Sequence, residues 1–247
     1  MSGISDLANM PVALLAGGLA TRLRPLTERV PKVLLEVAGK PFLHHQLTYL
    51  YGQGIRHVVL CVGFLGEMIR ERFSDRFGDG MHLRYSFDGP HLLGTGGAIR
   101  QALPLLGNSF FVLYGDSYLM IDYADVGAVF RRSGKRALMT LYENSDQWDA
   151  SNVWLDRGII RTYDKRHHRT EMRHIDYGLS AFESSVFTGL PEAGALDLAD
   201  IQKDLACRGE LAGYVAPHRF YEIGSHAGLA ELHAILLSGE PLSTFSQ

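Results

Sequence analysis

Runs of apolar residues alternate with amphipathic segments along the first half of the chain. The runs at residues 11–15, 57–62 and 109–114 are short and continuous, which is typical of strands buried on both faces of a parallel sheet. Pro41 precedes a segment whose apolar residues recur with a 3.6-residue period and which ends at Gly52 and Gly54, so it predicts a helix. We also expect strands at 82–87 and 136–141, and helices at about 65–73, 97–103 and 122–132.

Strands that alternate with helices of this length predict an α/β fold with a doubly wound, mostly parallel sheet. In such a sheet, ligands bind beside the carboxyl ends of the strands. The loops after Leu15, Phe87 and Tyr114 should therefore open on one edge of the sheet.

The second half of the chain has a different pattern. Short strand-like runs at 152–156, 159–163 and 174–182 are separated by turns, and they predict a small antiparallel sheet that covers the ligand edge. Helices near 198–206 and 227–237 follow. We expect one continuous α/β unit with a substrate-binding lobe, and no independent second domain.

Composition narrows the class of protein. The formal net charge of −3 argues against a broad nucleic-acid binder. No apolar stretch approaches the roughly 18 residues of a membrane span, and the first residues do not resemble a secretory signal. Cys61 and Cys207 show no CxxC spacing, so we expect a reduced, soluble cytoplasmic protein without a membrane partner.

Glycine is in excess, at 27 of 247 residues, and part of that excess follows the first predicted strand. Gly17 and Gly18 let the backbone approach a ligand, and their N–H groups are suited to phosphate oxygens. Arg22 lies nearby, and Lys32 follows Pro31. Neither the GxGxxG dinucleotide fingerprint nor the GxxxxGK[ST] phosphate loop is present.

Two further segments are expected to lie at the same edge of the sheet as this glycine-rich loop. Asp116 follows the strand at 109–114, where a carboxylate is well placed for Mg²⁺. Gly94-Thr95-Gly-Gly97 should lie between a strand and a helix, where a base could rest on the backbone beside free N–H groups. Asp88 would accept hydrogen bonds from guanine or uracil, although a turn-forming aspartate explains it equally well.

These motifs resemble, in order and spacing, the signature of the sugar-1-phosphate nucleotidyltransferases, or nucleotide-sugar pyrophosphorylases. The resemblance covers roughly residues 11–230 and is carried by AGGLATRLRPLT, VPKVLLEVAGKPFL, LGTGGA, YGDS and FYEIG. Within the family, the sequence resembles the short mannose- or heptose-1-phosphate guanylyltransferase-like branch. It implies a Rossmann-like, GT-A-like α/β domain with a small antiparallel sugar-binding lobe. Residues 1–247 would form one domain: a nucleotide-binding core at about 11–142, the sugar-phosphate lobe at about 143–225, and a C-terminal helix and tail at 226–247.

The resemblance also implies roles for individual residues. Arg22 and Lys32 would be catalytic, and Asp116 and Glu222 would bind Mg²⁺. The nucleotide would be bound by Leu15, Ala16, Gly17, Gly18, Asp88, Gly94 and Thr95, and the acceptor by Gly115, Lys165, Asp176 and Gly178.

Four sites depart from the family pattern. Glu222 stands where relatives have aspartate, and Asp164 stands where they have glutamate. Asp176-Tyr177 replaces an Asn-Ala pair, and Asn152 stands where relatives have a Tyr-Gly-Val run. These departures fall in the sugar lobe, so the identity of the sugar does not follow from the resemblance.

The implied reaction condenses an NTP with a sugar 1-phosphate, giving an NDP-sugar and pyrophosphate for nucleotide-sugar and polysaccharide biosynthesis. GTP with a mannose- or heptose-type 1-phosphate is the favoured pair. Alternatives are a UTP-, CTP- or dTTP-dependent transferase, a non-sugar phosphate or phosphonate acceptor, and a weakly catalytic nucleotide-binding regulatory module. The substrates are the expected partners, and the oligomeric state is left open.

Overall fold

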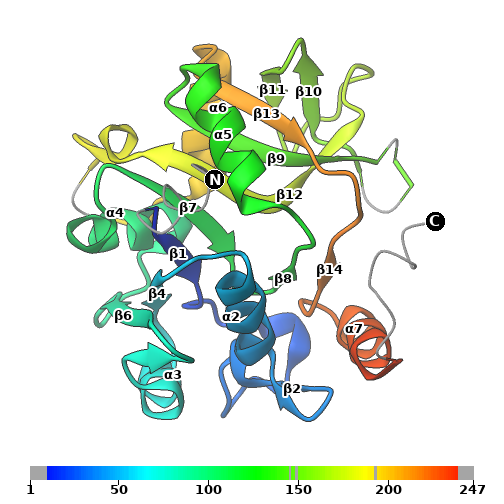
Figure 1. Ribbon diagram of the computed structural model, residues 1–247. Helices are drawn as coiled ribbons and strands as arrows, with labels where there is room; N and C mark the ends of the chain where they lie inside the picture. The colour runs from blue at the N-terminus through cyan, green and yellow to red at the C-terminus, as the bar shows by residue number, and fades with distance from the viewer. Residues whose placement is uncertain (1–9, 145, 148–149, 192–193, 239–247) are drawn as a thin grey trace.

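A single twisted sheet runs through the centre of the molecule in the computed structural model, which describes residues 10–144, 146–147, 150–191 and 194–238 (Figure 1). Its strand order is β10-β11-β13-β9-β12-β7-β1-β4-β6-β5. The strands are β1 (Val12–Leu15), β4 (His57–Val62), β5 (Arg76–Phe77), β6 (Met81–Phe87), β7 (Ser109–Tyr114), β9 (Ala137–Glu143), β10 (Val153–Asp156), β11 (Ile159–Tyr163), β12 (His174–Glu183) and β13 (Leu211–Val215).

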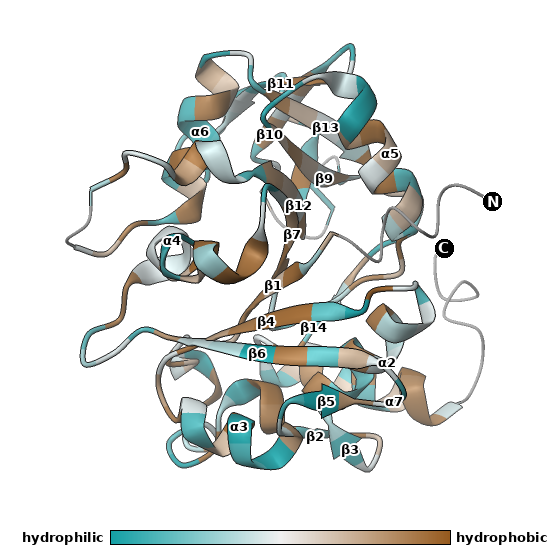
Figure 2. Ribbon diagram, turned by 60° about the vertical axis from the view of Figure 1, so that its left-hand side comes forward, coloured by the Kyte–Doolittle hydropathy of each residue, from teal (hydrophilic) through white to brown (hydrophobic). Residues whose placement is uncertain are grey.

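Helices cover both faces of this sheet. The helices on one face are α2 (Phe42–Gly52), α3 (Gly66–Phe73) and α5 (Tyr123–Ser133), and those on the other are α4 (Gly94–Leu106) and α6 (Leu198–Cys207). Successive residues of β7 alternate between the faces, so Phe111 joins the first apolar cluster and Phe110 the second. Figure 2 shows hydrophobic strands between helices whose outer surfaces are more polar.

The doubly wound core agrees with the expectation. β1 runs parallel to β4 and β7, and β4 runs parallel to β6. β12 is inserted antiparallel between β7 and β9, so the sheet as a whole is mixed.

The runs at 152–156, 159–163 and 174–182 were predicted to form a separate antiparallel sheet. In the structure these strands belong to the central sheet instead. β10, β11 and β13 extend the central sheet beyond β9 and β12. β12 is ten residues long and pairs with β7, β9 and β10, so its length joins the two halves. Pairing along β12 also satisfies backbone groups that β7 would otherwise expose at an edge.

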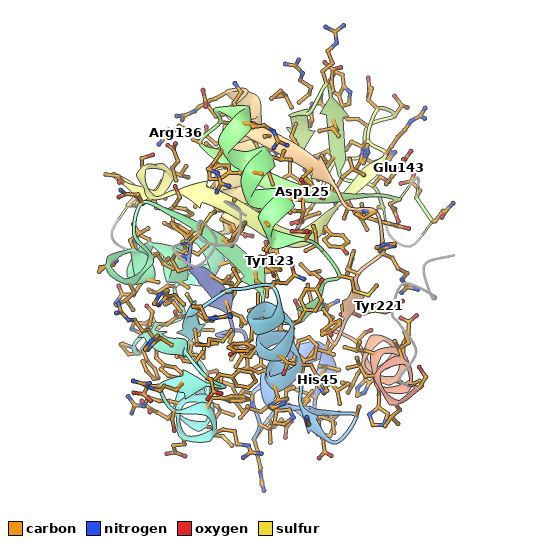
Figure 3. All side chains as sticks on the ribbon, viewed as in Figure 1. His45, Tyr123, Asp125, Arg136, Glu143 and Tyr221 are labelled. Carbon is orange, nitrogen blue, oxygen red and sulfur yellow. The ribbon has the colours of Figure 1, made fainter. Side chains whose placement is uncertain are left out.

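Two short ladders and the last helix complete the fold. β2 (Glu36–Val37) pairs with β3 (Lys40–Pro41), and β8 (Ser117–Tyr118) pairs with β14 (Tyr221–Glu222). α7 (His226–Ser238) packs on them through a third apolar cluster that includes Phe42, Tyr221 and Leu232. Figure 3 labels Tyr221, which lies on β14 above α7.

Most expected helices and strands lie within a few residues of their predicted bounds. The largest difference is α4, which begins at Gly94 rather than near residue 97 and ends at Leu106. Strands β5, β8 and β14 were not predicted, because two residues show no periodicity; β13 was also missed. Three 3₁₀ turns are present at Thr21–Leu23, Lys32–Leu34 and Ser184–Phe187. No helix in the described part of the chain has the length and apolar character needed to cross a membrane.

Candidate active site

The loops after β1, β6 and β7 open on one edge of the sheet, as predicted. Backbone hydrogen bonds tie this edge together: Gly115 N donates to Leu15 O over 3.0 Å, and Asp88 N donates to Val62 O over 2.9 Å. A Cβ on Gly115 would collide with the Leu15 carbonyl oxygen. Glycine at 115 therefore allows β1 and β7 to approach where a ligand would bind.

A first cavity of about 230 Å³ lies at this edge. All seven residues predicted to bind the nucleotide line it, together with Lys32, Gly115 and Asp116, which were predicted for other roles. The full lining is Leu15, Ala16, Gly17, Gly18, Lys32, Val33, Asp88, Leu92, Gly94, Thr95, Ala98, Tyr114, Gly115 and Asp116.

Asp88 both fixes a turn and lines the first cavity. Its Oδ2 accepts a hydrogen bond from Leu93 N over 3.3 Å, so it fixes the turn that leads into α4. The residue also lines the first cavity, where burial raises the pKa of its carboxyl group above the usual value, while the Leu93 N–H opposes that rise. Asp88 is thus a partly desolvated acceptor facing the cavity.

The glycines at the start of α4 are not free to bind a ligand through all their N–H groups. Gly96 N and Gly97 N donate to Leu196 O over 2.8 and 3.3 Å. Thr95 Oγ1 donates to Asp197 Oδ1 over 3.0 Å and accepts from Leu198 N over 2.8 Å. The segment before α6 therefore occupies the N–H groups of Gly96 and Gly97, which were expected to be free for a ligand.

Asp116 and Lys32 form the centre of the site. Lys32 Nζ lies 2.6 Å from Asp116 Oδ2, and the two side chains are 19% and 28% exposed. Pro31 precedes the 3₁₀ turn that carries Lys32, and Asp116 follows β7. Residues 84 positions apart are thereby joined by a charge-assisted hydrogen bond.

The β8–β14 ladder brings Glu222 to the same place. Glu222 pairs with Ser117, and Ile223 N donates to Asp116 O over 2.9 Å. A Cβ built on Gly224 would lie 3.3 Å from Arg22 Nη2 and 3.5 Å from Asp116 Oδ2. Arg22, Asp116 and Glu222 therefore converge around Gly224.

The longer side chain of Glu222 folds towards its own loop. Its carboxylate accepts hydrogen bonds from Gly224 N and from Ser225 Oγ, the latter over 2.7 Å. Ser225 Oγ in turn accepts from Gly228 N at the start of α7. Glutamate at this position thus links the site to the first turn of α7.

The donor set suits a divalent cation that shares its coordination with phosphate. Two carboxylates, Asp116 and Glu222, lie near each other beside Gly224; both line the second cavity, and Asp116 also lines the first. Among the described residues, no group of three or more His, Cys, Asp or Glu side chains could hold a metal alone. Mg²⁺ commonly binds through one or two carboxylates plus substrate phosphates. The pair therefore fits a Mg²⁺ site that substrate phosphates complete, rather than a site made of protein ligands alone.

A second cavity of about 1010 Å³ adjoins the first. It contains the predicted residues Arg22, Lys165, Asp176, Gly178 and Glu222, and it shares Tyr114 and Asp116 with the first cavity. Further residues of its lining are Ser117, Tyr142, Ala150, Asn152, Ile175, Tyr177, Arg219, Phe220, Ser225, Ala227, Gly228 and Glu231. Arg22, which follows the glycine loop in sequence, lines this second cavity and not the first.

Asp176 is the most enclosed carboxylate of the second cavity, with a side chain 7% exposed. Its Oδ1 accepts from Gly178 N over 3.0 Å, and its Oδ2 accepts from Tyr163 Oη over 3.2 Å. Lys165 Nζ lies 4.0 Å from Oδ2. Burial raises the pKa of Asp176, and the positive charge of Lys165 opposes that rise.

Gly178 is needed for this arrangement. Its φ is +102°, and the pairing of β12 with β9 shifts register between Asp176 and Ser180. A Cβ at 178 would lie 2.9 Å from Ser117 Oγ, so the bulge brings β12 against β8.

Asp164, which stands where relatives have glutamate, is held by hydrogen bonds within the chain. Its Oδ2 accepts from Lys203 Nζ over 2.7 Å, and its Oδ1 accepts from Arg166 N. The hydrogen bond from Lys203, followed by that from Arg166 N, holds the pKa of Asp164 well below its usual range. Asp164 thus fixes the turn after β11 to α6.

Several residues of the site were not predicted. Gln46 is buried on α2, and its Nε2 donates to Tyr114 O and Ser117 O over 3.2 and 2.9 Å, which holds the turn that carries Asp116. Gln46 could have been identified from the sequence because it is a polar residue on the apolar face of a predicted helix. Arg219 and Glu231, paired over 3.1 Å, offered no signal in sequence.

The fold and the site define an α/β protein with two adjoining cavities at one edge of its sheet. A model of the nucleotidyl transferase family matches residues 12–238, and the chain belongs to that family.

Among curated relatives, D-glycero-α-D-manno-heptose 1-phosphate guanylyltransferase of Campylobacter jejuni is 41% identical over 113 residues, which cover 46% of this chain and 50% of that protein. N-acetylmuramate α-1-phosphate uridylyltransferase of Neisseria meningitidis is 40% identical over 115 residues, with coverage of 46% and 50%. The β catalytic subunit of mannose-1-phosphate guanylyltransferase from Danio rerio is 28% identical over 214 residues, with coverage of 78% and 59%. The chain spans about half the length of the first two of these relatives.

Solved structures share the fold. HddC from Yersinia pseudotuberculosis, complexed with GMP-PN, superposes with a TM-score of 0.76 at 22% identity, covering 92% of this chain and 99% of that one. UDP-glucose pyrophosphorylase complexed with UDP-glucose gives a TM-score of 0.77 at 17% identity, with coverage of 94% and 99%.

Proposed function

We propose that this protein transfers a nucleoside monophosphate from an NTP to a sugar 1-phosphate, producing an NDP-sugar and pyrophosphate. The observation that carries the proposal is the meeting of two cavities at Asp116. The first is lined by the glycine-rich backbone, and the second by the residues expected to bind the acceptor. Two substrates bound in this way would place their phosphates on either side of Asp116.

In the reaction, an oxygen of the acceptor phosphate attacks the α-phosphorus of the NTP. The new P–O bond forms as the bond between the α-phosphorus and the bridging oxygen breaks, and pyrophosphate leaves with that electron pair. The attacking oxygen is already ionised at pH 7, so no general base is needed. The barrier is the approach of two anions, which positioning and charge neutralisation lower.

The residues of the chain divide this task. Lys32 stabilises charge at the α-phosphate, Arg22 holds phosphate oxygens in the second cavity, and Lys165 seats the acceptor phosphate. Leu15, Ala16, Gly17, Gly18, Asp88, Gly94 and Thr95 bind the nucleotide, and Gly115, Asp176 and Gly178 shape the acceptor site. Asp116 and Glu222 would hold Mg²⁺, which supplies charge neutralisation on the NTP phosphates when it is bound.

GTP with a heptose- or mannose-type 1-phosphate is our favoured substrate pair. Support comes from the names of the relatives in Campylobacter jejuni and Danio rerio, and from the fold likeness to a protein complexed with GMP-PN. The uridylyltransferase of Neisseria meningitidis, at 40% identity over a stretch of similar length, makes UTP the second candidate. Within the chain, Asp88 accepts equally well from guanine and uracil N–H groups.

We also propose that residues 1–247 act as one domain, with the core, lobe and C-terminal segment divided at about residues 142 and 225. We place the enzyme in the reduced cytoplasm, because Cys61 and Cys207 are both free thiols.

Pyrophosphate release tests the function. Each of GTP, UTP, CTP, ATP and dTTP is combined with mannose, heptose and glucose 1-phosphates in the presence of Mg²⁺. We expect release with one NTP well above the others, and only when an acceptor is present. Nucleotide binding without turnover on any acceptor would contradict the proposal and favour a regulatory module.

A further inference from the structure

The second cavity presents a hydrogen-bond acceptor to whatever fills it. Asp176 brings a carboxylate into its lining, and Asn152, the residue before β10, lines the same cavity. The Oδ1 atom of Asn152 is buried and has no hydrogen-bond partner within the described part of the chain. The carboxylate of Asp176 therefore calls for a ligand that carries donors.

The carboxylate of Asp176 has acceptor capacity to spare. An ionised carboxylate offers about four lone-pair sites. Gly178 N takes one on Oδ1 and Tyr163 Oη takes one on Oδ2. Lys165 Nζ, 4.0 Å away, contributes charge without a hydrogen bond of ordinary length.

Each cation of this cavity lies near at least one carboxylate of the chain. Arg219 pairs with Glu231 over 3.1 Å and lies over the Tyr221 ring. Arg22 lies near Asp116 and Glu222, beside Gly224. Lys165 stands next to Asp176 and, under the proposed function, seats the acceptor phosphate.

We propose that Asp176 sets the charge class of the acceptor: the site takes an uncharged, polyhydroxylated sugar 1-phosphate and rejects one whose sugar bears a carboxylate. Hydroxyl groups of the sugar donate to Asp176. A carboxylate on the sugar would meet the largely buried Asp176 carboxylate, where like charges repel and Asp176 gains no donor. This inference rests on the proposed function and narrows its substrate class.

The same argument separates this chain from one of its relatives. N-acetylmuramate carries a carboxylate, and the Neisseria meningitidis protein is named for its 1-phosphate. We expect this chain to discriminate against that acceptor despite the similarity of the two sequences.

Matched acceptor pairs test the proposal. Mannose and mannuronate 1-phosphates, and glucose and glucuronate 1-phosphates, differ only by oxidation of CH₂OH to carboxylate. Steady-state pyrophosphate release is measured for each pair with the preferred NTP. For the wild-type protein we expect kcat/KM for the neutral member to exceed that for the acidic member by at least about 100-fold. Equal use of both members would overturn the inference and leave the proposed function standing, whereas no release with any acceptor, heptose 1-phosphate included, would overturn both.

Asp176→Asn assigns the discrimination to this side chain. The substitution preserves size, and we expect the neutral-to-acidic ratio to fall below about 10, mainly through a lower KM for the acidic sugar. Asp156→Asn removes an exposed carboxylate of β10 that pairs with Arg161 and should leave the ratio unchanged. An unchanged ratio in Asp176→Asn would contradict the assignment.

Asn152→Asp provides an independent variant should Asp176→Asn fold poorly. It adds a second carboxylate to the lining of the same cavity, so the ratio should rise above the wild-type value. A ratio at or below the wild-type value would contradict the proposal.

Discussion

The two cavities that meet at Asp116 are built in different ways. The first is made largely of backbone and small side chains at the ends of parallel strands, and the fold positions it directly. The second is lined by charged and aromatic side chains from β12, β14, α7 and the turns between them. Under the proposed function, a triphosphate presents the same chemistry whichever sugar is activated, whereas the acceptor varies. The contrast therefore indicates that the fold would set the reaction and that the side chains of the second cavity would set the substrate.

The largest effect should come from Lys32, which bonds Asp116 where the cavities meet. In Lys32→Ala we expect turnover to fall by about 10²–10³-fold, because one charged group that stabilises the transition state is lost. Pyrophosphate release measures it. Lys40→Ala is the matched control, since Lys40 is exposed and lines neither cavity. Full turnover in Lys32→Ala would remove the centre of the proposed site.

Glu222 tests whether the second cavity contributes to cation binding. In Glu222→Gln the charge of one proposed ligand is lost, so the Mg²⁺ concentration for half-maximal activity should rise at least about tenfold. Glu231→Gln, which also removes a carboxylate from the second cavity, should leave the Mg²⁺ dependence unchanged. Equal Mg²⁺ dependence in all three proteins would assign Glu222 solely to the turn before α7.

Asp88 tests the first cavity separately from the second. Loss of a charged acceptor in Asp88→Asn should raise the KM for the preferred NTP by about 10–100-fold. The KM for the sugar 1-phosphate should stay within about threefold of wild type, because Asp88 does not line the second cavity. A change confined to the acceptor KM would refute this division between the cavities.

The smallest effect concerns the turn beside the acceptor site. The depressed pKa of Asp164 means that the folded state favours its ionised form. Its contribution to stability is therefore full above the unfolded pKa of about 3.9 and is lost as pH falls towards the lower folded pKa. Asp164→Asn should lower the free energy of unfolding at pH 7, and the difference from wild type should shrink below about pH 4.

Urea unfolding at pH 7, 4 and 3 measures this difference. Asp156→Asn, which breaks an exposed pair with Arg161, is the control and should change stability less. A difference between Asp164→Asn and wild type that stays constant with pH would contradict the role given to the pair with Lys203.

The sequence was sufficient to predict much of the first cavity. Leu15, Asp88 and Asp116 follow predicted strands, and the carboxyl ends of parallel strands meet at one edge. Their shared position therefore follows from chain order alone. The hydrogen bonds of Gly96 and Gly97 to Leu196 O could not be foreseen in this way, because they join segments about 100 residues apart.

The second cavity depended on contacts that periodicity does not encode. Glu222 lies on β14, a strand of two residues that is too short to leave a pattern, and Arg219 precedes that strand by two residues. The expectation of a separate antiparallel sheet failed because sequence shows that a strand exists but not which strand it pairs with, and β12 pairs into the central sheet. The departures at Asp176 and Asn152 were visible in sequence, and their common cavity became apparent only in the structure.

The central claim is that an acceptor phosphate in the second cavity attacks the α-phosphorus of a nucleotide in the first. Sugar 1-phosphate labelled with ¹⁸O in its non-bridging phosphate oxygens tests this most directly, with products analysed by mass spectrometry. The account predicts that all the label remains in the NDP-sugar and none appears in pyrophosphate. Label in pyrophosphate or in released inorganic phosphate would contradict it.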